Sequence, residues 1–423
     1  MIKINKFLGS KGIFKLEKIL NKRRNVQNTN ISLVSKIIKD IKKNKIKAVI
    51  KYEKKFSNNN KIIPTTEEIN KVARSLDPKV KKAIDYAYNR IFKFHSLQKV
   101  KDINYTDKLN NSFKYKSVPI NKVGVYVPAN LPSTLLMNGV PAKIAGVKKI
   151  VLANPRVNGK LNSAVMYAAK KCSISDSEII SVGGSQAIGS LAYIQKVNKI
   201  IGPGNIYVAR AKREVFGDVG IEGMIAGPSE IAVVADRKTD LNEVLTSMIG
   251  QAEHDVNSQC ILITKDKNLI DKFKKEIKKK LVNLPRKNIA SKSLKNNGLI
   301  VYAQNDKQIV DTINEVAPEH LELNVKNNKN YLSKIYAAGS IMLGKYSPMA
   351  VSDYNVGTTH VLPCYGTAKF SSGLNLNEFY KKISYITLSK KGVEKIGEYA
   401  THLAEYEELY GHAQSIRSRM RRK

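Results

Sequence analysis

The sequence predicts an α/β fold, with two strand-and-helix units lying between helical ends. From about residue 121, short β-branched runs such as KVGVYVP, KKIVLANP, SEIISVGG and NKIIGPGN alternate with segments of helix length. Alternation of this kind, with glycine at the strand ends, is typical of a parallel sheet covered by helices. The same texture returns over residues 240–373, in NEVLTSMIGQAEH (helix) and SIMLGKYSP (strand, then loop).

The two ends of the chain are predicted to be helical. Residues 1–120 contain periodic apolar positions in ISLVSKIIKDIKKNKIKAVIKY and EEINKVARSLDPKVKKAIDYAYNRIFKF. The last predicted helical stretch is GVEKIGEYATHLAEYEELYGHAQSIRSRM. A chain of 423 residues is long enough for two or more domains and a well-buried core.

Composition favours a reducing, cytoplasmic compartment. No apolar run approaches the roughly 20 residues that span a membrane, and the basic start lacks a secretory cleavage pattern. An organellar transit peptide stays an open alternative. The three cysteines, Cys172, Cys260 and Cys364, are widely spaced. They predict neither a disulfide framework nor a cysteine-based zinc site.

The net charge of +38 is the strongest compositional feature, and it is the kind expected of a nucleic-acid-binding protein. However, only 13 of the 73 basic residues are arginine, the residue preferred for phosphate and base recognition. The lysines accompany many asparagines and isoleucines, which share A/T-rich codons. We therefore interpret the charge as compositional bias on solvated faces and expect no specific nucleic acid partner.

Two glycine-rich turns are candidates for an anion or nucleotide site, although the chain has no GxGxxG. SVGGSQAIGSLAY and IIGPGNIYVARAKREV each read as a strand, a turn and a helix start, where backbone N–H groups can bind phosphate. Each alone is as well explained as a structural turn, but together they favour a nucleotide site. The serine of MIAGPSEIAVVAD is a turn or cap serine on pattern alone, not a G-x-S-x-G nucleophile.

Two Glu-His pairs are candidates for metal or acid/base chemistry. In GQAEH, spacing alone nominates Glu253 with His254, while Gln251 shares a helical face with His254. A capped helix end is the alternative, and the absence of HExxH disfavours a zincin protease. In APEHLEL, Glu319 and His320 follow a stiffening proline and could form a general base pair, or could face solvent on a loop.

Histidines and acidic residues gather in the second half of the chain. SDYNVGTTHVLP places Asp353 seven residues before His360, and YEELYGH places Glu407 five residues before His412. Five of the six histidines follow residue 250. This clustering favours a metal or acid/base site over unrelated core histidines.

Taken together, the motifs resemble one enzyme family. GPGNIYVARAKREVFG, IAGPSEI, GQAEHD, APEHLEL, GTTHVLPCYG and LYGH are similar to histidinol dehydrogenase in order and spacing. The resemblance extends from about KVGVYVP to His412, and only the first ~120 residues carry no diagnostic motif. It implies oxidation of L-histidinol through histidinal to L-histidine with two NAD⁺. It also implies one zinc per site and an intertwined homodimer of two incomplete Rossmann-like α/β domains with helical extensions.

The resemblance assigns a role to each motif residue. Zinc would be held by Gln251, His254, Asp353 and His412, and the acid/base pair would be Glu319 and His320. Substrate contacts would come from the zinc ligands and His320 together with Ser229, His360 and Glu407; NAD contacts would come from Tyr126, Gln186 and Asn205. Glu407 and His412 would reach the partner's site. The implied ligand is thus Gln251 rather than Glu253.

The implied chemistry suits the substrate. Histidinol brings an imidazole and an amine, which are good donors for zinc. His320 would take the hydroxyl proton and Glu319 would activate the water needed to hydrate the aldehyde. None of the cysteines falls in an acid/base position, so Cys260 and Cys364 are interpreted as packing residues.

The expected organisation has four parts: residues 1–20 as an N-terminal arm, 21–122 with 231–374 as the metal-side α/β domain, 123–230 as the NAD-side domain, and 375–423 as the tail. Two other classes compete with this interpretation. One is a zinc hydrolase that uses Glu319 as base without a nicotinamide cofactor. The other is a basic nucleic-acid-binding protein.

Overall fold

A computed structural model describes residues 3–6, 9–25, 31–98, 100–222 and 227–420. The chain divides into two compact units. The larger comprises Met1–Gln98 and Asn121–Glu378, and the smaller comprises Lys99–Ile120 and Phe379–Lys423. The larger unit contains two parallel sheets with helices, so the predicted α/β class is confirmed.

The first sheet of the larger unit has six strands, all parallel, in the order β1-β11-β10-β9-β12-β13. Its strands are β1 (Lys3–Lys6), β9 (Glu230–Ala235), β10 (Gln259–Thr264), β11 (Leu299–Tyr302), β12 (His320–Asn324) and β13 (Ser340–Leu343). Every residue of β9 and β10 is buried. Central strands buried on both faces read as continuous apolar runs, which is why SEIAVVA and QCILIT lack alternation.

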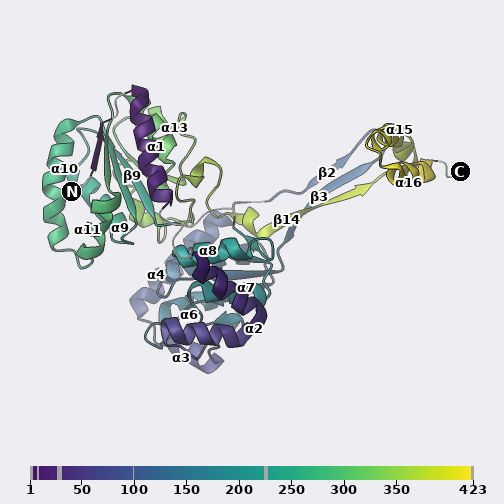
Figure 1. The fold of residues 1–423 in the computed structure, drawn as a ribbon, viewed down its shortest axis with the longest axis horizontal. Coiled ribbons are helices and arrows are strands. Elements are labelled where there is room, and N and C mark those ends of the chain that lie inside the picture. Colours follow the sequence, from purple (N-terminus) through teal and green to yellow (C-terminus); the bar gives the residue numbers. More distant parts are fainter. Residues whose placement is uncertain (1–2, 7–8, 26–30, 99, 223–226, 421–423) are drawn as a thin grey trace. The chain divides into compact units, whose positions relative to one another are not determined.

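Helices cover both faces of this sheet (Figure 1). On one face lie α9 (Leu241–Ala252), α10 (Lys267–Val282) and α11 (Lys287–Asn297), and on the other α1 (Gly9–Asn25) and α12 (Asp306–Val316). The lysine-rich α10 buries Leu269, Ile270, Phe273 and Ile277 in the core and leaves its charged positions outside. The short helices α13 (Lys329–Leu332) and α14 (Met349–Ser352) flank β13.

The second sheet of the larger unit has five parallel strands in the order β6-β5-β4-β7-β8. These are β4 (Lys122–Tyr126), β5 (Lys149–Ala153), β6 (Ile179–Ile180), β7 (Lys199–Ile201) and β8 (Gly220–Ile221). Two of its strands are only two residues long. A parallel sheet with such short edge strands agrees with the expectation of an incomplete Rossmann-like layer.

Helices from before and within this sheet's own sequence cover it. One core joins α2 (Ile31–Ser57) to α7 (Gly184–Tyr193) and α8 (Ile206–Val215). Also packed together are α4 (Pro78–His95), α5 (Pro132–Ile144) and α6 (Ser163–Lys171), and α3 (Thr66–Arg74) contacts α6. The expected boundaries put residues 21–122 with the metal-side domain, whereas α2 buries its apolar face against the five-stranded sheet.

Many of the helices begin after a short polar N-cap residue. The N-cap side chain accepts a backbone N–H at Thr65, Asp77, Asn162, Asn205, Asp240, Asp266, Asn305 and Ser389. Each such cap satisfies an N–H that the helix leaves unpaired and contributes about 1 kcal/mol. Polar residues at segment boundaries therefore fix where the helices begin.

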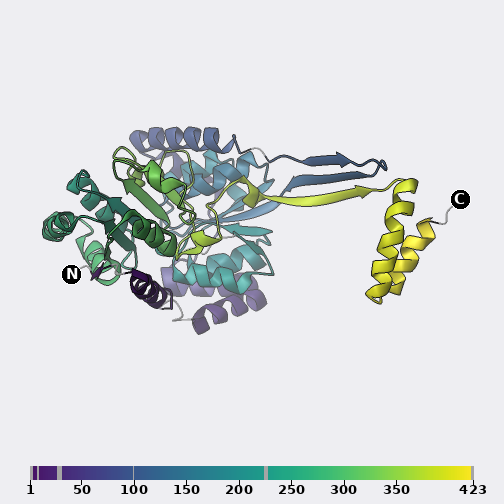
Figure 2. The same ribbon diagram turned by 90° about the horizontal axis from the view of Figure 1, so that it is seen from above.

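The smaller unit is a three-stranded antiparallel sheet and a helical hairpin (Figure 2). The strand order is β14 (Tyr380–Thr387), β3 (Ser112–Pro119) and β2 (Ile103–Thr106), and the helices are α15 (Lys390–Tyr406) and α16 (Tyr410–Met420). The two helices pack against each other, so the helical end of the chain is confirmed. Strands β2 and β3 interrupt the part expected to be mostly helical, in segments rich in β-favouring residues.

The smaller unit leaves many large apolar side chains exposed. Its exposed members include Ile103, Tyr105, Tyr115, Ile383, Tyr385, Ile386, Leu388, Ile396, Tyr399, Leu403, Tyr406, Leu409 and Tyr410. Contiguous exposed apolar surface usually marks an interaction face. No helix in the described ranges is long and apolar enough to cross a membrane.

Candidate active site

The candidate acid/base pair lies at the amino end of a central strand. Helix α12 ends at Val316. Its C-cap, Ala317, adopts the left-handed conformation (φ 45°, ψ 60°), and Pro318 follows directly. His320 is the first residue of β12, and its register partner in β9 is Ile231. Because parallel strands start at the same sheet edge, Glu319 lies next to the start of β9.

The carboxyl group of Glu319 is buried and hydrogen-bonded. Its Oε2 accepts the backbone N–H of Glu230 at 2.8 Å, and the residue is only 6% exposed. Burial raises the pKa of this carboxyl well above its ordinary value, against the lowering effect of the Glu230 N–H, and the nearby carboxylates of Glu230 and Asp353 raise it further. A raised pKa makes the ionised form a stronger base.

His320 lies between two carboxylates. Its Nε2 is 3.7 Å from Glu319 Oε1 and 3.7 Å from Asp353 Oδ1. Burial, with His360 and His254 nearby, lowers the pKa of this imidazole to about 3, so the ring is neutral and can accept a proton. The residue is 2% exposed, so the alternative of a solvent-facing loop pair is wrong.

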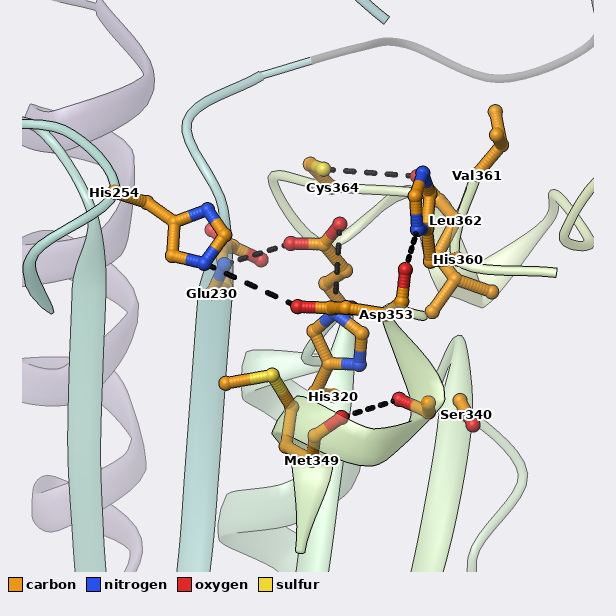
Figure 3. Close-up of polar contacts among 12 residues, drawn as sticks. Glu230, His254, His320, Ser340, Met349, Asp353, His360, Val361, Leu362 and Cys364 are labelled. Carbon is orange, nitrogen blue, oxygen red and sulfur yellow. Dashed lines mark hydrogen bonds and ion pairs between the residues drawn. The ribbon is translucent and has the colours of Figure 1, made fainter. Parts of the chain in front are cut away.

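Three imidazoles surround Asp353, each supplied by a different segment (Figure 3). His254 Nε2 is 3.9 Å from Asp353 Oδ2, and His360 Nδ1 donates to the Asp353 carbonyl oxygen at 2.7 Å. Burial raises the pKa of Asp353 to about 7 and lowers that of His360 to about 4. It also lowers the pKa of His254, whose side chain is 44% exposed. Neutral imidazoles beside a carboxylate form a donor set suited to a metal.

Gln251 contributes an unpaired amide to the same segment as His254. It lies in the last turn of α9, is 0% exposed, and neither its Oε1 nor its Nε2 has a hydrogen-bond partner within the described structure. Buried side-chain amides are almost always paired, so this one is poised for a partner from outside the chain. Glu253 instead forms the helix C-cap and is half-buried.

The described residues contain no group of three His, Cys, Asp or Glu side chains positioned to hold a metal ion. The ligand set implied by the resemblance has three members in the larger unit. Only His254 and Asp353 are of these residue types, and the third is the amide of Gln251. The fourth ligand, His412, belongs to the smaller unit. The chemistry of His254 and Asp353 and the unpaired amide of Gln251 fit the part of the implied zinc set that lies in the larger unit.

Glu230 is a functional candidate that the sequence did not single out. Besides holding Glu319 through its N–H, its buried carboxylate pairs with Arg23 of α1 and accepts the N–H of Tyr365 at 3.2 Å. Arg23 also donates to Gln259 Oε1 at 2.9 Å. A glutamate directly after a Gly-Pro-Ser turn is a weak signal, and its arginine partner lies in a segment without diagnostic motifs.

The three expected NAD contacts follow strands of the five-stranded sheet. Tyr126 ends β4 and its hydroxyl accepts the N–H of Gly184 at 3.4 Å. Gln186 lies in the first turn of α7 and Asn205 is the N-cap of α8. All three lie toward the carboxyl edge of a parallel sheet, where nucleotides bind in open α/β folds.

Both glycine-rich turns are already capped by the protein. The N–H of Gly183 donates to Glu53 Oε1 at 2.9 Å, and Gln186 Nε2 donates to the same oxygen at 2.8 Å. At α8, the Asn205 side chain accepts from Tyr207 and Val208. The carboxylate of Glu53 therefore occupies the position at α7 where the turn pattern suggested a phosphate.

The remaining predicted residues are distributed over both units. Ser229 directly precedes β9, is half-buried, and its carbonyl accepts the N–H of Gln259 at 3.0 Å. Glu407 is the C-cap of α15, His412 lies in the first turn of α16, and both side chains are exposed. The larger unit thus brings together Glu319, His320 and Asp353, with His254 and His360 adjacent.

All three cysteines are buried as free thiols. Burial raises the pKa of Cys172 and Cys260 to about 12, and it raises that of Cys364 well above the ordinary value, with Glu319 and Glu230 adding to the effect. A thiol without thiolate character is a poor nucleophile. The interpretation of Cys260 and Cys364 as packing residues is consistent with this.

Two helix-covered parallel sheets and a buried Glu-His pair beside further imidazoles define an α/β fold with a candidate acid/base site. Residues 20–420 match the family described as histidinol dehydrogenase. The chain is 57% identical to a histidinol dehydrogenase of Pelagibacter ubique over 96% of both chains. It is 40% identical to one of Acinetobacter baylyi, over 92% of this chain and 93% of that one. The crystal structure of histidinol dehydrogenase from Elizabethkingia anophelis superposes with a TM-score of 0.88 at 33% identity, covering 99% of this chain and 98% of that one. The chain belongs to the histidinol dehydrogenase family.

The state of the thiols yields a direct prediction. Iodoacetamide at pH 7 should leave the folded protein unlabelled, because the reagent needs an accessible thiolate. Intact-mass spectrometry reads the outcome, and the same protein unfolded in urea serves as control and should take up one label on each of its three cysteines. Rapid labelling of Cys364 in the folded protein would contradict its inert state and restore a cysteine nucleophile as a candidate.

Proposed function

We propose that the protein oxidises L-histidinol through L-histidinal to L-histidine, the final steps of histidine biosynthesis, as a zinc-dependent and NAD-linked cytoplasmic enzyme. One observation carries the proposal: a buried Glu-His pair lies beside a carboxylate and two further imidazoles, in a member of the histidinol dehydrogenase family. That combination disfavours a hydrolase without a nicotinamide cofactor and a nucleic-acid-binding protein.

Zinc would be held by Gln251, His254 and Asp353, with His412 of the partner subunit as the fourth ligand. The unpaired buried amide of Gln251 and the lowered pKa of His254 support this set, since a neutral imidazole offers its lone pair. When bound, zinc supplies an electrophilic centre that orients the imidazole and amine of histidinol.

The remaining substrate contacts would come from Ser229, His360 and Glu407. Tyr126, Gln186 and Asn205 would line the NAD side. The amide N–H₂ of Gln186 donates to Glu53. The side-chain oxygen of Gln186 can therefore accept a hydrogen bond from a cofactor N–H. NAD⁺, when bound, accepts the hydride in each oxidation.

In the first oxidation, His320 takes the hydroxyl proton of histidinol. The lowered pKa keeps this imidazole neutral. Glu319 and Asp353, each with a carboxyl oxygen 3.7 Å from its Nε2, stabilise the imidazolium when they are ionised. As the O–H bond breaks, the carbinol carbon loses its hydrogen as hydride and the C=O bond of histidinal forms.

In the second oxidation, Glu319 takes a proton from water, whose oxygen bonds to the aldehyde carbon. The proton that His320 took in the first oxidation passes to the aldehyde oxygen, which completes the diol and returns His320 to its neutral form. The resulting diol loses a hydroxyl proton to His320 and a second hydride from carbon, and the carboxylic acid results. The Glu230 N–H, bonded to Glu319 Oε2 at 2.8 Å, leaves the other oxygen for this work. Keeping histidinal bound through both steps protects the aldehyde from amines and bulk water.

The active protein would be a homodimer in which Glu407 and His412 reach the partner's site. The exposed apolar side chains of the smaller unit support this, because a sheet of three strands and two helices leaves them without a core of their own.

The activity itself is the first test. Protein supplied with zinc, L-histidinol and NAD⁺ should raise the absorbance of NADH, with two equivalents formed per histidine. Prior chelator treatment should abolish the signal and added zinc should restore it. Zinc-loaded protein that forms no NADH would overturn the proposed function.

Glu319→Gln separates the two half-reactions. The amide cannot accept a proton, so oxidation of histidinal should fall about a hundredfold, while oxidation of the alcohol falls much less. Stopped-flow measurement of NADH from each substrate reads the difference, and Glu315→Gln, at a surface ion pair with Lys369, is the matched control. Equal losses in both half-reactions would remove Glu319 from water activation.

His412→Ala tests the ligand from the smaller unit. Loss of one of four ligands should lower the zinc retained after dialysis, measured by mass spectrometry of the metal, while sedimentation should still show a dimer. The control is His402→Ala, an exposed histidine on α15 of the same unit. Zinc retention equal to that of the control would exclude His412 as a ligand.

A further inference from the structure

The segment from Asp353 to His360 carries two residues of the proposed site, and its ends are tied together. Asp353 is the C-cap of α14, and its carbonyl accepts the Nδ1–H of His360 at 2.7 Å. A displacement of the segment that keeps this bond moves the Asp353 carboxylate and the His360 imidazole together. Segment 353–360 has no helix or strand of its own, so its position depends on contacts from elsewhere.

Arg90, near the end of α4, contacts the middle of this segment. Its Nε donates to the carbonyl of Asn355 at 2.7 Å, and its Nη2 donates to the carbonyl of Val356 at 3.0 Å. The planar guanidinium presents two N–H groups in a fixed fork that fits two successive carbonyls, which the single ammonium of lysine does not reproduce. Charge-assisted bonds of this kind are about twice as strong as neutral ones.

Gly357 brings the backbone of the segment directly against α4. It has φ +114°, and a Cβ added there would lie 3.1 Å from the carbonyl oxygen of Arg90 and 3.4 Å from Phe94 Cβ. A side chain at this position would be strained and crowded at once. The close approach and the guanidinium fork are independent observations of the same docking.

The docking joins two parts of the larger unit. Helix α4 packs against α5, and α5 contacts β4 of the five-stranded sheet. At the far end of the segment, Thr134 of α5 has its Oγ1 3.5 Å from His360 Nε2. On its other side, Asp353 faces His320 and His254, which flank strands of the six-stranded sheet. Segment 353–360 thus connects the acid/base pair to the layer expected to bind the cofactor.

We propose that Arg90 is a positioning residue for the reaction: it docks segment 353–360 on α4 and so fixes Asp353 and His360 relative to the acid/base pair. This inference rests on the proposed function. Arg90 touches neither the substrate nor the reacting atoms. Its effect passes through two backbone carbonyls, so it acts on geometry, and a misplacement of about 1 Å can cost up to a hundredfold in rate.

The test compares Arg90→Met and Arg90→Lys in the full-length, zinc-loaded protein. The methionine variant should lose about tenfold to a hundredfold in kcat/KM for L-histidinol. The lysine variant should lose less, because its ammonium can still bind one of the two carbonyls. The KM for NAD⁺ should stay near that of the unchanged protein. The control is Lys93→Met, which removes an exposed cation from the same helix and should leave both constants unaltered.

Hydrogen exchange gives a readout that does not depend on turnover. In Arg90→Met, the amides of residues 353–360 should exchange faster, whereas those of α4 and the thermal midpoint should change little because the arginine side chain is exposed. Unchanged exchange would overturn the docking, and faster exchange with full activity on histidinol would overturn the positioning role. If the unchanged protein does not oxidise histidinol, the proposed function fails, and the exchange result still decides the docking.

Discussion

The site depends on the burial of one carboxylate. Glu319 is buried from bulk water, and the N–H of Glu230 binds one of its oxygens because β12 and β9 start side by side in a parallel sheet. The neutral state of His320, its distances to Glu319 and Asp353, and the raised pKa values nearby all follow from this shared dry position. Replacing water with fixed protein groups strengthens every electrostatic interaction in such a site.

An ion pair between Glu230 and Arg23 supports the position of Glu319. Glu230 brings a buried negative charge close to a carboxylate that must itself ionise, which would be costly without compensation. Arg23, from the first helix, supplies that compensation and reaches Gln259 as well. Helix α1 therefore covers one face of the sheet and also, through Arg23, binds Glu230 next to the proposed site.

The sequence anticipated the α/β class and the terminal helices, because strand texture and apolar periodicity are local signals. It could not decide whether Glu319 and His320 face solvent, since that depends on the register of β12 with β9. The contact of Arg90 could not be predicted for a related reason. It binds backbone carbonyls 265 and 266 residues away, and every residue has a backbone carbonyl, so the sequence does not indicate which ones an arginine binds. The metal, acid/base, substrate and NAD roles assigned by resemblance stay predictions.

The site proposed at the six-stranded sheet lies at the edge opposite to the one where open α/β folds usually bind ligands. Most residues proposed for chemistry in the larger unit precede or begin its strands, as Ser229 and His320 do, whereas Asp353 and His360 come after β13 and α14. None lies in the turns directly after β9, β10, β11 or β12. We therefore expect those four turns to be under less constraint from the proposed reaction. Over evolution they can lengthen, shorten or change composition with little penalty, and they are the natural places for an inserted sequence.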